Sequence, residues 1–339
     1  MTESPFTEGF SSWLETPTPS RQELVLGRVS VLVPTFNRKD VLKKAIEAYL
    51  GQSALKEVAE ILIIDDGSTD GTDALVAEAA RSSPVPIRYY RQANRGQAAA
   101  RNVGIREARS ELVLFTDDDI IPAPDLVDQH LRSHERHAEP HFAVLGYVTW
   151  ATEVRATPFM RWLGLDGPLF AYAHFAGRTD LDFRAFYTCN LSLKTDFLRK
   201  NGMFDEDFKG YGWEDTELGY RLERKGLRLL YNPAALAYHY KFVSFAEACR
   251  RAQEVAFALP VFEKKEAAAY LKELDSRTSV KRGFRRRLRS VIVPVLSPFK
   301  FLVDSRVPLP WAFYRVLYSE ATSMSRKVQE QVSDGRPNP

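Results

Sequence analysis

Three consecutive aspartates, Asp117, Asp118 and Asp119, follow a run of apolar residues and are the most distinctive chemical feature of the sequence. No Lys or Arg lies between Arg109 and Arg132, so nothing nearby in the sequence offsets their charge. Clustered carboxylates of this kind suit a hard divalent cation, since Mg²⁺ and Mn²⁺ prefer oxygen ligands. A polar turn after a strand is the alternative explanation. The pattern favours a metal or metal–phosphate site, with Asp117 and Asp119 around one ion.

A second pair of carboxylates, Asp65 and Asp66, lies in the stretch IIDDGSTDGT, again behind an apolar run. A carboxylate at such a strand end can accept a hydrogen bond from a ribose hydroxyl or a base N–H group. Ser68 or Asp70 would cap the following helix, and the two roles are compatible. The sequence contains neither G-x-G-x-x-G nor G-x-x-x-x-G-K-[ST], so it gives no support to dinucleotide or P-loop binding.

Two further acids, Glu214 and Asp215, open a predicted helix in GWEDTELGYRL, directly behind Gly212 and Trp213. The helix dipole favours acidic residues at this position, which is a purely structural explanation. A carboxylate behind a flexible, aromatic lip is also well placed as a general base for an incoming hydroxyl group. His239 ends a strand-like run, and it would matter as a metal ligand only if that strand end lies near the three aspartates.

A strand–helix alternation that begins at Arg28 would position these residues. Strands are predicted in RVSVLVP, EILIIDD, IRYYRQ and ELVLFT, and each is followed by a helical pattern. Such an alternation predicts an α/β fold with a mostly parallel sheet that is covered by helices on both faces. Because ligands bind beyond the carboxyl ends of such strands, segments 34–38, 65–70 and 117–119 should converge at one edge.

The second half of the chain is less regular. Residues 151–189 are rich in aromatic side chains without a clear period, and ordered patterns return from Asn190 to about residue 240. Ser244 and Glu247 then form a capping box at the start of a predicted helix, which we expect to break at Pro260.

The charge of the chain is unevenly distributed. Residues 1–240 carry 28 Lys and Arg against 34 Asp and Glu, whereas residues 241–339 carry 19 against 10. Six basic residues lie between Lys281 and Arg289, and apolar residues at every fourth position lie among them. A basic amphipathic segment is typical of binding to anionic lipid; a solvated helix packed on the body and a nucleic-acid patch are the alternatives. We expect residues 281–318 to contact a membrane surface, and we expect no nucleic-acid partner. The supporting aromatic residues are Trp311, Phe313, Tyr314 and Tyr318.

The cysteine content and the N-terminus bear on the compartment. Two cysteines in 339 residues, Cys189 and Cys249, cannot form a disulfide framework. Residues 1–27 lack the basic start and apolar core of a signal peptide, and they read as a polar lead-in. We expect a cytoplasmic protein, peripheral on the inner face of the plasma membrane.

Taken together, five stretches resemble the family 2 glycosyltransferases, which have the GT-A fold. They are VSVLVPTFNR, ILIIDDGSTDGT, NRGQAAARNVGI, FTDDDIIP and GWEDTELGYRL, and they span about residues 28–240. The resemblance implies an inverting transfer of a sugar from a nucleotide-diphosphate donor, with Mn²⁺ or Mg²⁺ as the cofactor. It also implies that Asp117–Asp119 form the DxD motif and that Glu214 and Asp215 form the catalytic ED pair, with Asp215 as the base.

The resemblance assigns further residues to the site. Asp119, Asp117 and His239 would bind the metal, and Trp213, Gly212 and Asn190 would contact the acceptor. The donor would be bound by Pro34, Thr35, Asn37, Arg38, Asp65, Asp66, Arg101, Asp117 and Asp118.

These expectations define four units and one main function. We expect a lead-in at 1–27, a nucleotide-sugar-binding half at 28–150, an acceptor-binding and catalytic half at 151–240, and a basic, mainly helical extension at 241–339. The expected donor is a UDP-sugar, and the acceptor is a glycan or a lipid-linked molecule in contact with the aromatic segment 151–189. The alternatives are a haloacid-dehalogenase-like phosphohydrolase, and a non-catalytic protein that binds sugar nucleotides or membranes.

Overall fold

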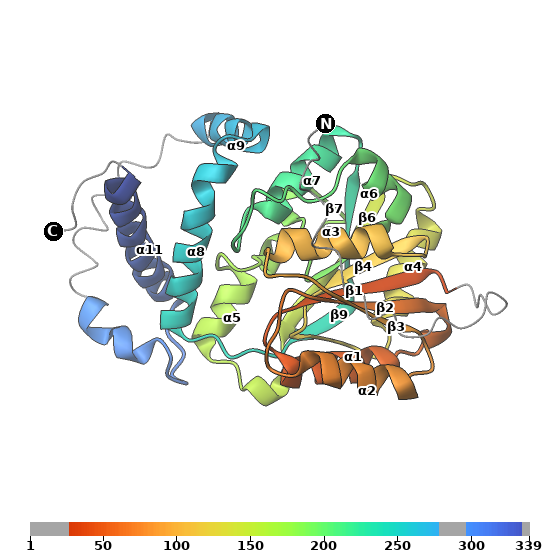
Figure 1. Cartoon of the computed structure of the whole chain (residues 1–339). Helices are drawn as coiled ribbons and strands as arrows, with labels where there is room; N and C mark the ends of the chain where they lie inside the picture. The colour runs from red at the N-terminus through yellow and green to blue at the C-terminus, as the bar shows by residue number, and fades with distance from the viewer. Residues whose placement is uncertain (1–26, 278–295, 334–339) are drawn as a thin grey trace, which may run out of the picture.

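The computed structural model describes residues 27–277 and 296–333, and these form one nine-stranded sheet with helices around it (Figure 1). The order of the strands is β3-β2-β1-β4-β8-β6-β9-β5, and β7 pairs with β9. The strands are β1 Val29–Thr35, β2 Val58–Asp65, β3 Ile87–Arg91, β4 Leu112–Thr116, β5 Ile120–Pro122, β6 Phe142–Trp150, β7 Asp180–Leu181, β8 Asn190–Lys194 and β9 Arg228–His239.

The first four long strands are parallel, as the strand–helix alternation predicts. β1 pairs in parallel with both β2 and β4, and β2 pairs in parallel with β3. Every residue of β1 and β4 is buried, because helices cover both faces of the sheet. The crossover helices are α1 Lys39–Leu50, α2 Thr72–Ser82 and α3 Gln97–Glu107. In Figure 1, α1 and α2 lie on one face and α3 lies on the other.

The sheet continues through strands from the less regular half of the sequence. β8 is antiparallel to both β4 and β6, while β6 is parallel to β9. The pairing of β5 with β9 places Ile120, directly after the three aspartates, opposite His239. One hydrophobic core therefore extends from Val29 in β1 to Ala237 in β9, and residues 28–150 and 151–240 share it.

Helices α4 Leu126–Arg136, α5 Pro158–Leu165, α6 Thr195–Asn201 and α7 Glu214–Arg224 complete the body. In residues 151–189, α5 and three short 3₁₀ turns, Thr152–Val154, Tyr172–Phe175 and Phe183–Ala185, alternate with irregular backbone. Most of the aromatic side chains of this segment are buried, among them Trp162, Tyr172 and Phe186. Their main role is therefore to fill the core.

The described part of the C-terminal extension contains α8 Phe245–Phe262, α9 Glu266–Arg277, a 3₁₀ helix at Ser297–Leu302 and α11 Trp311–Ser333. The side-chain cap by Ser244 is confirmed, because its Oγ accepts a hydrogen bond of 3.1 Å from the Glu247 N–H group. The expectation that Pro260 breaks α8 is wrong, since the helix continues to Phe262. Pro260 lies in the last turn, so little helix remains beyond it to be disrupted.

The extension packs on the body through two apolar clusters, one between α5, α8 and α11 and one that joins Phe183 and Phe208 to α8 and α9. Tyr314 and Leu317 of α11 are fully buried against Phe159 and Trp162 of α5. This burial corrects the prediction that Tyr314 faces a membrane, whereas Trp311 is 42% exposed. The basic run at 281–289 lies outside the described residues. Within the described parts of the chain, no helix has both the length and the apolar character needed to span a bilayer.

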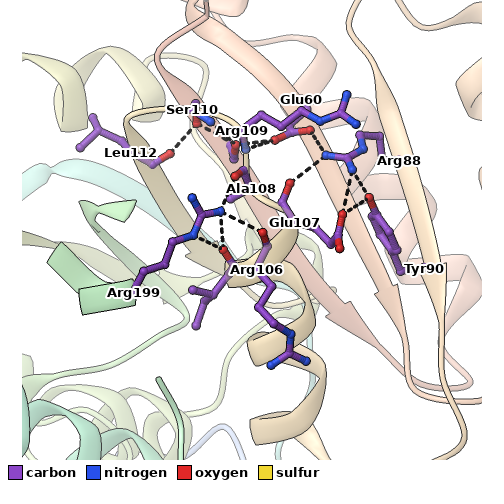
Figure 2. Close-up of polar contacts among 12 residues, drawn as sticks. Glu60, Arg88, Tyr90, Arg106, Glu107, Ala108, Arg109, Ser110, Leu112 and Arg199 are labelled. Carbon is purple, nitrogen blue, oxygen red and sulfur yellow. Dashed lines mark hydrogen bonds and ion pairs between the residues drawn. The ribbon is translucent and has the colours of Figure 1, made fainter. Parts of the chain in front are cut away.

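Near the amino ends of the strands, a polar network ties α3 to the sheet (Figure 2). Arg199 of α6 donates to the carbonyl oxygens of Ile105, Arg106 and Ala108 at the end of α3, at distances of 2.5 to 3.0 Å. The buried Glu60 of β2 accepts from Arg88 at 2.7 Å. The cations thus satisfy carbonyl groups that a helix end leaves without partners.

Candidate active site

The carboxyl ends of the strands surround a cavity of about 390 Å³, as the sequence predicts. Thr35 of β1, Asp66 behind β2, Asp117–Asp119 behind β4 and His239 of β9 all line it. Asp215 lines it from the start of α7. Segments that are far apart in the sequence are therefore brought to one edge of the sheet.

Arg38 provides the positive charge that the sequence around the three aspartates lacks. Its guanidinium lies 2.8 Å from Asp118 Oδ1 and 2.6 Å from Asp119 Oδ2. Thr35 Oγ1 donates a second hydrogen bond to Asp118, at 2.8 Å. Burial raises the pKa of Asp118 to about 7 against the opposing effect of Arg38. For Asp119, burial also favours the neutral form, but His239 and Arg38 outweigh it and hold the pKa well below its usual range.

His239 lies beside the aspartates, which was the condition for its proposed role. Its Nε2 is 3.2 Å from Asp119 Oδ2, and its ring stacks on Trp150 with the centroids 5.1 Å apart. Nδ1 of this buried histidine has no hydrogen-bond partner among the described residues. Nε2 of His239 and Oδ2 of Asp119 thus lie next to each other at the wall of the cavity.

Asp119 and His239 can supply part of the ligand set of a divalent cation. Among the described residues, no group of three or more His, Cys, Asp or Glu side chains is arranged to hold a metal ion. Mg²⁺ nevertheless needs only one or two carboxylates when phosphate oxygens and water complete its shell. Asp119 and His239 could supply such a partial set, with Asp117 at the same wall of the cavity.

Arg101 joins the aspartate run to the two acids at the start of α7. Its Nη2 is 3.1 Å from Asp117 Oδ1, and its Nη1 is 3.2 Å from Glu214 Oε1 and 3.6 Å from Asp215 Oδ1. The side chain of Arg101 is only 3% exposed, so these charges interact with little solvent screening. Arg101 lines the cavity as expected, but its guanidinium contacts carboxylates of the protein.

Asp215 is the more accessible of the two acids, with 25% of its side chain exposed against 5% for Glu214. Thr188 holds Asp215 through its N–H group at 3.1 Å and its hydroxyl at 2.9 Å. Burial raises the pKa of Asp215, and Arg101 opposes the shift. Burial also raises the pKa of Glu214 to about 7. Thr188 was missed at the sequence level, because no motif marks its contact with a residue 27 positions away.

The lip before α7 is tied to the C-terminal extension. Gly212 and Trp213 have φ angles of 104° and 72°, in the left-handed region that is unusual for Trp. The indole of Trp213 stacks on Phe262 of α8 with centroids 4.4 Å apart, and Nε1 donates to Val255 O at 3.0 Å. Gly212 and Trp213 both line the cavity.

Asn190, which the resemblance assigned to the acceptor, lies outside the cavity. It is 1% exposed, and its side chain bonds His130 Nε2 at 2.8 Å and Ala235 O at 2.9 Å. It does not line the cavity, so a direct contact with the acceptor is not supported. In residues 151–189, Phe170 and Tyr187 do line it, and sequence reasoning also missed Tyr211 and Arg251.

The predicted nucleotide-binding residues separate into two groups. Pro34, Thr35 and Asp66 line the cavity, whereas Asp65 and Asn37 do not. Asp65 Oδ1 accepts from the Ser68 N–H group at 2.7 Å, and Asn37 Oδ1 accepts from the Thr69 N–H group at 2.7 Å. These two residues therefore shape the loop behind β2.

Asp66 also uses both carboxylate oxygens within the protein. They accept from Gln92 Nε2 at 2.7 Å and from the backbone N–H groups of Arg95 and Gly96 at 2.8 and 2.9 Å. The prediction that Ser68 or Asp70 caps the next helix is wrong, since the N-cap of α2 is Gly71; Asp70 precedes it and accepts from the Thr72 N–H group at 3.2 Å.

Comparison with known proteins agrees with this architecture. Residues 30–157 match the family model described as glycosyl transferase family 2, and residues 173–244 match the model described as the N-terminal domain of galactosyltransferase. A validoxylamine A glucosyltransferase of Streptomyces hygroscopicus subsp. limoneus is 34% identical over 224 residues, which cover 59% of this chain and 48% of that protein. The chain thus spans about half the length of the curated relatives it matches first.

Solved structures share the fold at low sequence identity. The mannosyltransferase PcManGT from Pyrobaculum calidifontis, in complex with GDP-Man and Mn²⁺, is 20% identical with a TM-score of 0.57, covering 94% of this chain and 91% of that chain. TarS 1–349 of S. aureus, in complex with UDP, is 18% identical with a TM-score of 0.52, covering 92% and 93%. The chain therefore carries a glycosyltransferase family 2 region at residues 30–157 and has the GT-A fold.

Proposed function

We propose that this protein transfers a sugar from a nucleotide-diphosphate donor to a hydroxyl group of an acceptor, with inversion at the anomeric carbon. The observation that carries the proposal is the bridge through Arg101, which joins Asp117 of the aspartate run to Asp215. A carboxylate for the diphosphate end and a carboxylate for the acceptor end thus line one cavity. Relatives that bind GDP-Man or UDP support a nucleotide-sugar donor, and UDP-sugars are the first donors to test.

Asp215 is the proposed general base. Its contacts with Thr188 fix the carboxylate, and burial raises its pKa toward a value at which it can accept a proton from a hydroxyl group. In an inverting transfer the base lies on the side of the sugar opposite the leaving group. The acceptor, a glycan or a lipid-linked molecule, would enter beside Trp213 and Gly212, where Phe170 and Tyr187 offer aromatic faces.

Asp119 and His239 would hold Mn²⁺ or Mg²⁺, with Asp117 near the donor. When bound, the cation would neutralise the charge that develops on the departing diphosphate. The chain's own contribution there is to keep Asp119 ionised, which the neighbouring Arg38 and His239 favour. The phosphohydrolase alternative loses support, because Asp117 is paired with Arg101 and follows the fourth strand of a GT-A fold.

Release of nucleoside diphosphate tests this function directly. We expect wild-type protein with Mn²⁺ to release it from one of a panel of UDP- and GDP-sugars, and Asp215→Asn to lower kcat by a factor of about 10²–10⁴. Asp207→Asn is the matched control, because this side chain is 74% exposed and outside the cavity. Activity of Asp215→Asn equal to that of the control would exclude Asp215 as the base. Inertness of the wild type with every donor would favour the non-catalytic alternative.

We further propose that residues 281–318 rest on an anionic membrane at the inner face of the plasma membrane. Phe299, Phe301, Val307 and Trp311 are 47%, 74%, 54% and 42% exposed, and they follow the basic run in the sequence. Exposed apolar and aromatic side chains of this kind suit the interface of a bilayer. Deleting the whole tail would be a poor test, since it would also remove the buried Tyr314.

Point variants avoid this difficulty. We expect Phe301→Ser with Trp311→Ser to reduce sedimentation with vesicles that contain anionic lipid, while Phe257→Ser has no effect. Phe257 is the matched control, because it is 71% exposed but belongs to α8. Equal sedimentation of the double variant and the wild type would refute membrane contact through this segment.

A further inference from the structure

A group of basic side chains lies beside the cavity with too little negative charge to balance it. This basic cluster consists of Lys241, just after β9, and Arg250 and Arg251 of α8. Lys241 Nζ is 3.2 Å and Arg251 Nε is 3.8 Å from Glu247 Oε1, and Arg250 pairs with the same carboxylate. Three cations therefore share Glu247, and Glu254, 4.0 Å from Arg250, is a weak additional partner.

The members of the basic cluster differ in how they face the cavity. Arg251 lines it, with its guanidinium 5.5 Å from the ring centre of Tyr211, which lines it too. Lys241 lies two residues beyond His239, outside the lining of the cavity, and its side chain is 29% exposed. Arg250 does not line the cavity and is 63% exposed. Arg251 is thus the member at the cavity wall, Lys241 lies behind it and is partly shielded from water, and Arg250 projects into solvent.

Glu247 is poorly placed to neutralise Arg251 fully. Its backbone N–H group is held by Ser244 Oγ at 3.1 Å in the side-chain cap, which fixes the start of α8. Its carboxylate is closest to Arg250 and Lys241, while Arg251 is 3.8 Å away, beyond ordinary hydrogen-bond distance. Within residues 27–277 and 296–333, Arg251 has no closer carboxylate than this one. A guanidinium with free donors at a cavity wall is suited to an oxyanion, because its planar fork matches phosphate oxygens.

We propose that Arg251 and Lys241 form a phosphate-binding subsite beside the cavity, separate from the pair Asp119 and His239. The ligand is a phosphate ester or a phosphoanhydride. It can be the diphosphate of the donor or a phosphate group carried by the acceptor, since both classes of oxyanion fit the same cations. The subsite concerns binding, and so it does not depend on whether the transfer reaction proposed above takes place.

Calorimetric titration of the full chain distinguishes the two sources of phosphate. Donor-type probes are UDP and GDP, with uridine and guanosine as the uncharged matches. Acceptor-type probes are hexyl phosphate and hexyl β-glucoside, added with Mn²⁺ and saturating UDP or GDP. The variants are Arg251→Gln and Lys241→Gln, and Arg250→Gln removes the same charge from the same helix without altering the cavity. Thermal melting checks that each variant is folded.

We expect Arg251→Gln to weaken binding of a phosphate-bearing probe about tenfold, as is usual for a lost charge-assisted hydrogen bond, and Lys241→Gln to weaken it less. Loss confined to UDP or GDP identifies the donor, and loss confined to hexyl phosphate identifies the acceptor. Three results would overturn the proposal: no phosphate probe binds the wild type, Arg250→Gln has an equal effect, or the uncharged matches lose as much affinity. If the protein binds the phosphate probes as expected but releases no nucleoside diphosphate from any donor, the proposed transfer reaction is refuted and the phosphate-binding subsite is not.

Discussion

Replacing Arg101 by Met should be among the most destabilising single changes in this protein. The guanidinium lies 3.1 to 3.6 Å from one carboxylate oxygen each of Asp117, Glu214 and Asp215, and its side chain is 3% exposed. Met fills a similar volume, so the change removes charge and hydrogen bonds more than packing. Three carboxylates would then share one poorly solvated region without a guanidinium to offset their repulsion.

The size of the effect follows from this environment. Removing one partner of a buried ion pair typically costs about 3–5 kcal/mol, because the remaining charge is left unpaired. Arg101 serves three carboxylates, of which Glu214 is itself 5% exposed. We therefore expect a loss near the upper end of that range at pH 8. At pH 5 the loss should be smaller, since burial raises the pKa values of Glu214 and Asp215 and protonation of these two acids relieves the repulsion.

Urea unfolding of wild type, Arg101→Met and Arg95→Met at both pH values provides the measurement. Arg95 pairs with Glu206 at 2.7 Å, but its side chain is 53% exposed, so we expect a loss of less than about 1 kcal/mol. If Arg101→Met loses no more stability than Arg95→Met, or loses more at pH 5 than at pH 8, then Arg101 does not compensate the three acids as described.

Three other predictions follow from the same region. Burial raises the pKa of Glu214 from its ordinary value of 4.5 to about 7, so this residue lowers the folding stability as pH rises from 4.5 to 7. The stability of Glu214→Gln relative to wild type should rise over that window in urea unfolding, and a flat difference would contradict the shift. Thr188→Val removes the hydroxyl 2.9 Å from Asp215 and should lower kcat about tenfold with unchanged affinity for nucleoside diphosphate; an unchanged kcat would show that the contact does not position the base. Gly146→Ala would place a Cβ 2.4 Å from Ala235 O and should cost about 1–3 kcal/mol, and a thermal midpoint equal to wild type would show that the backbone yields there.

The convergence of the site was predictable from the sequence, because it depends only on the direction of the strands. Parallel strands carry their carboxyl ends to the same edge, and the register of β1 and β2 brings Thr35 opposite Asp65. The position of His239 needed one more fact, the antiparallel pairing of β9 with β5. The sequence therefore specified which segments meet, and pairing between strands decided which side chains touch.

The partners of the acids could not be predicted in the same way. The guanidinium of Arg38 reaches Asp119 across 81 positions, and Arg101 reaches Glu214 across 113. Both arginines lie in stretches that resemble the family, but the resemblance assigned them to the donor and not to the carboxylates. Asn190 shows the same limit, since its type suits a sugar hydroxyl and only the packing of α4 on β8 reveals its bond to His130.

The C-terminal tail shows how composition can suggest the wrong surface. Aromatic residues after a basic run are typical of a membrane interface, and composition alone treats Trp311, Tyr314 and Tyr318 alike. The spacing of the residues distinguishes them. Tyr314, Leu317 and Tyr318 recur at i, i+3 and i+4, so they share one face of a helix. That face packs on α5 and α8, with Tyr314 and Leu317 fully buried. Helical periodicity therefore separates Tyr314 and Leu317, which belong to the core, from Trp311 on the exposed face of the same helix.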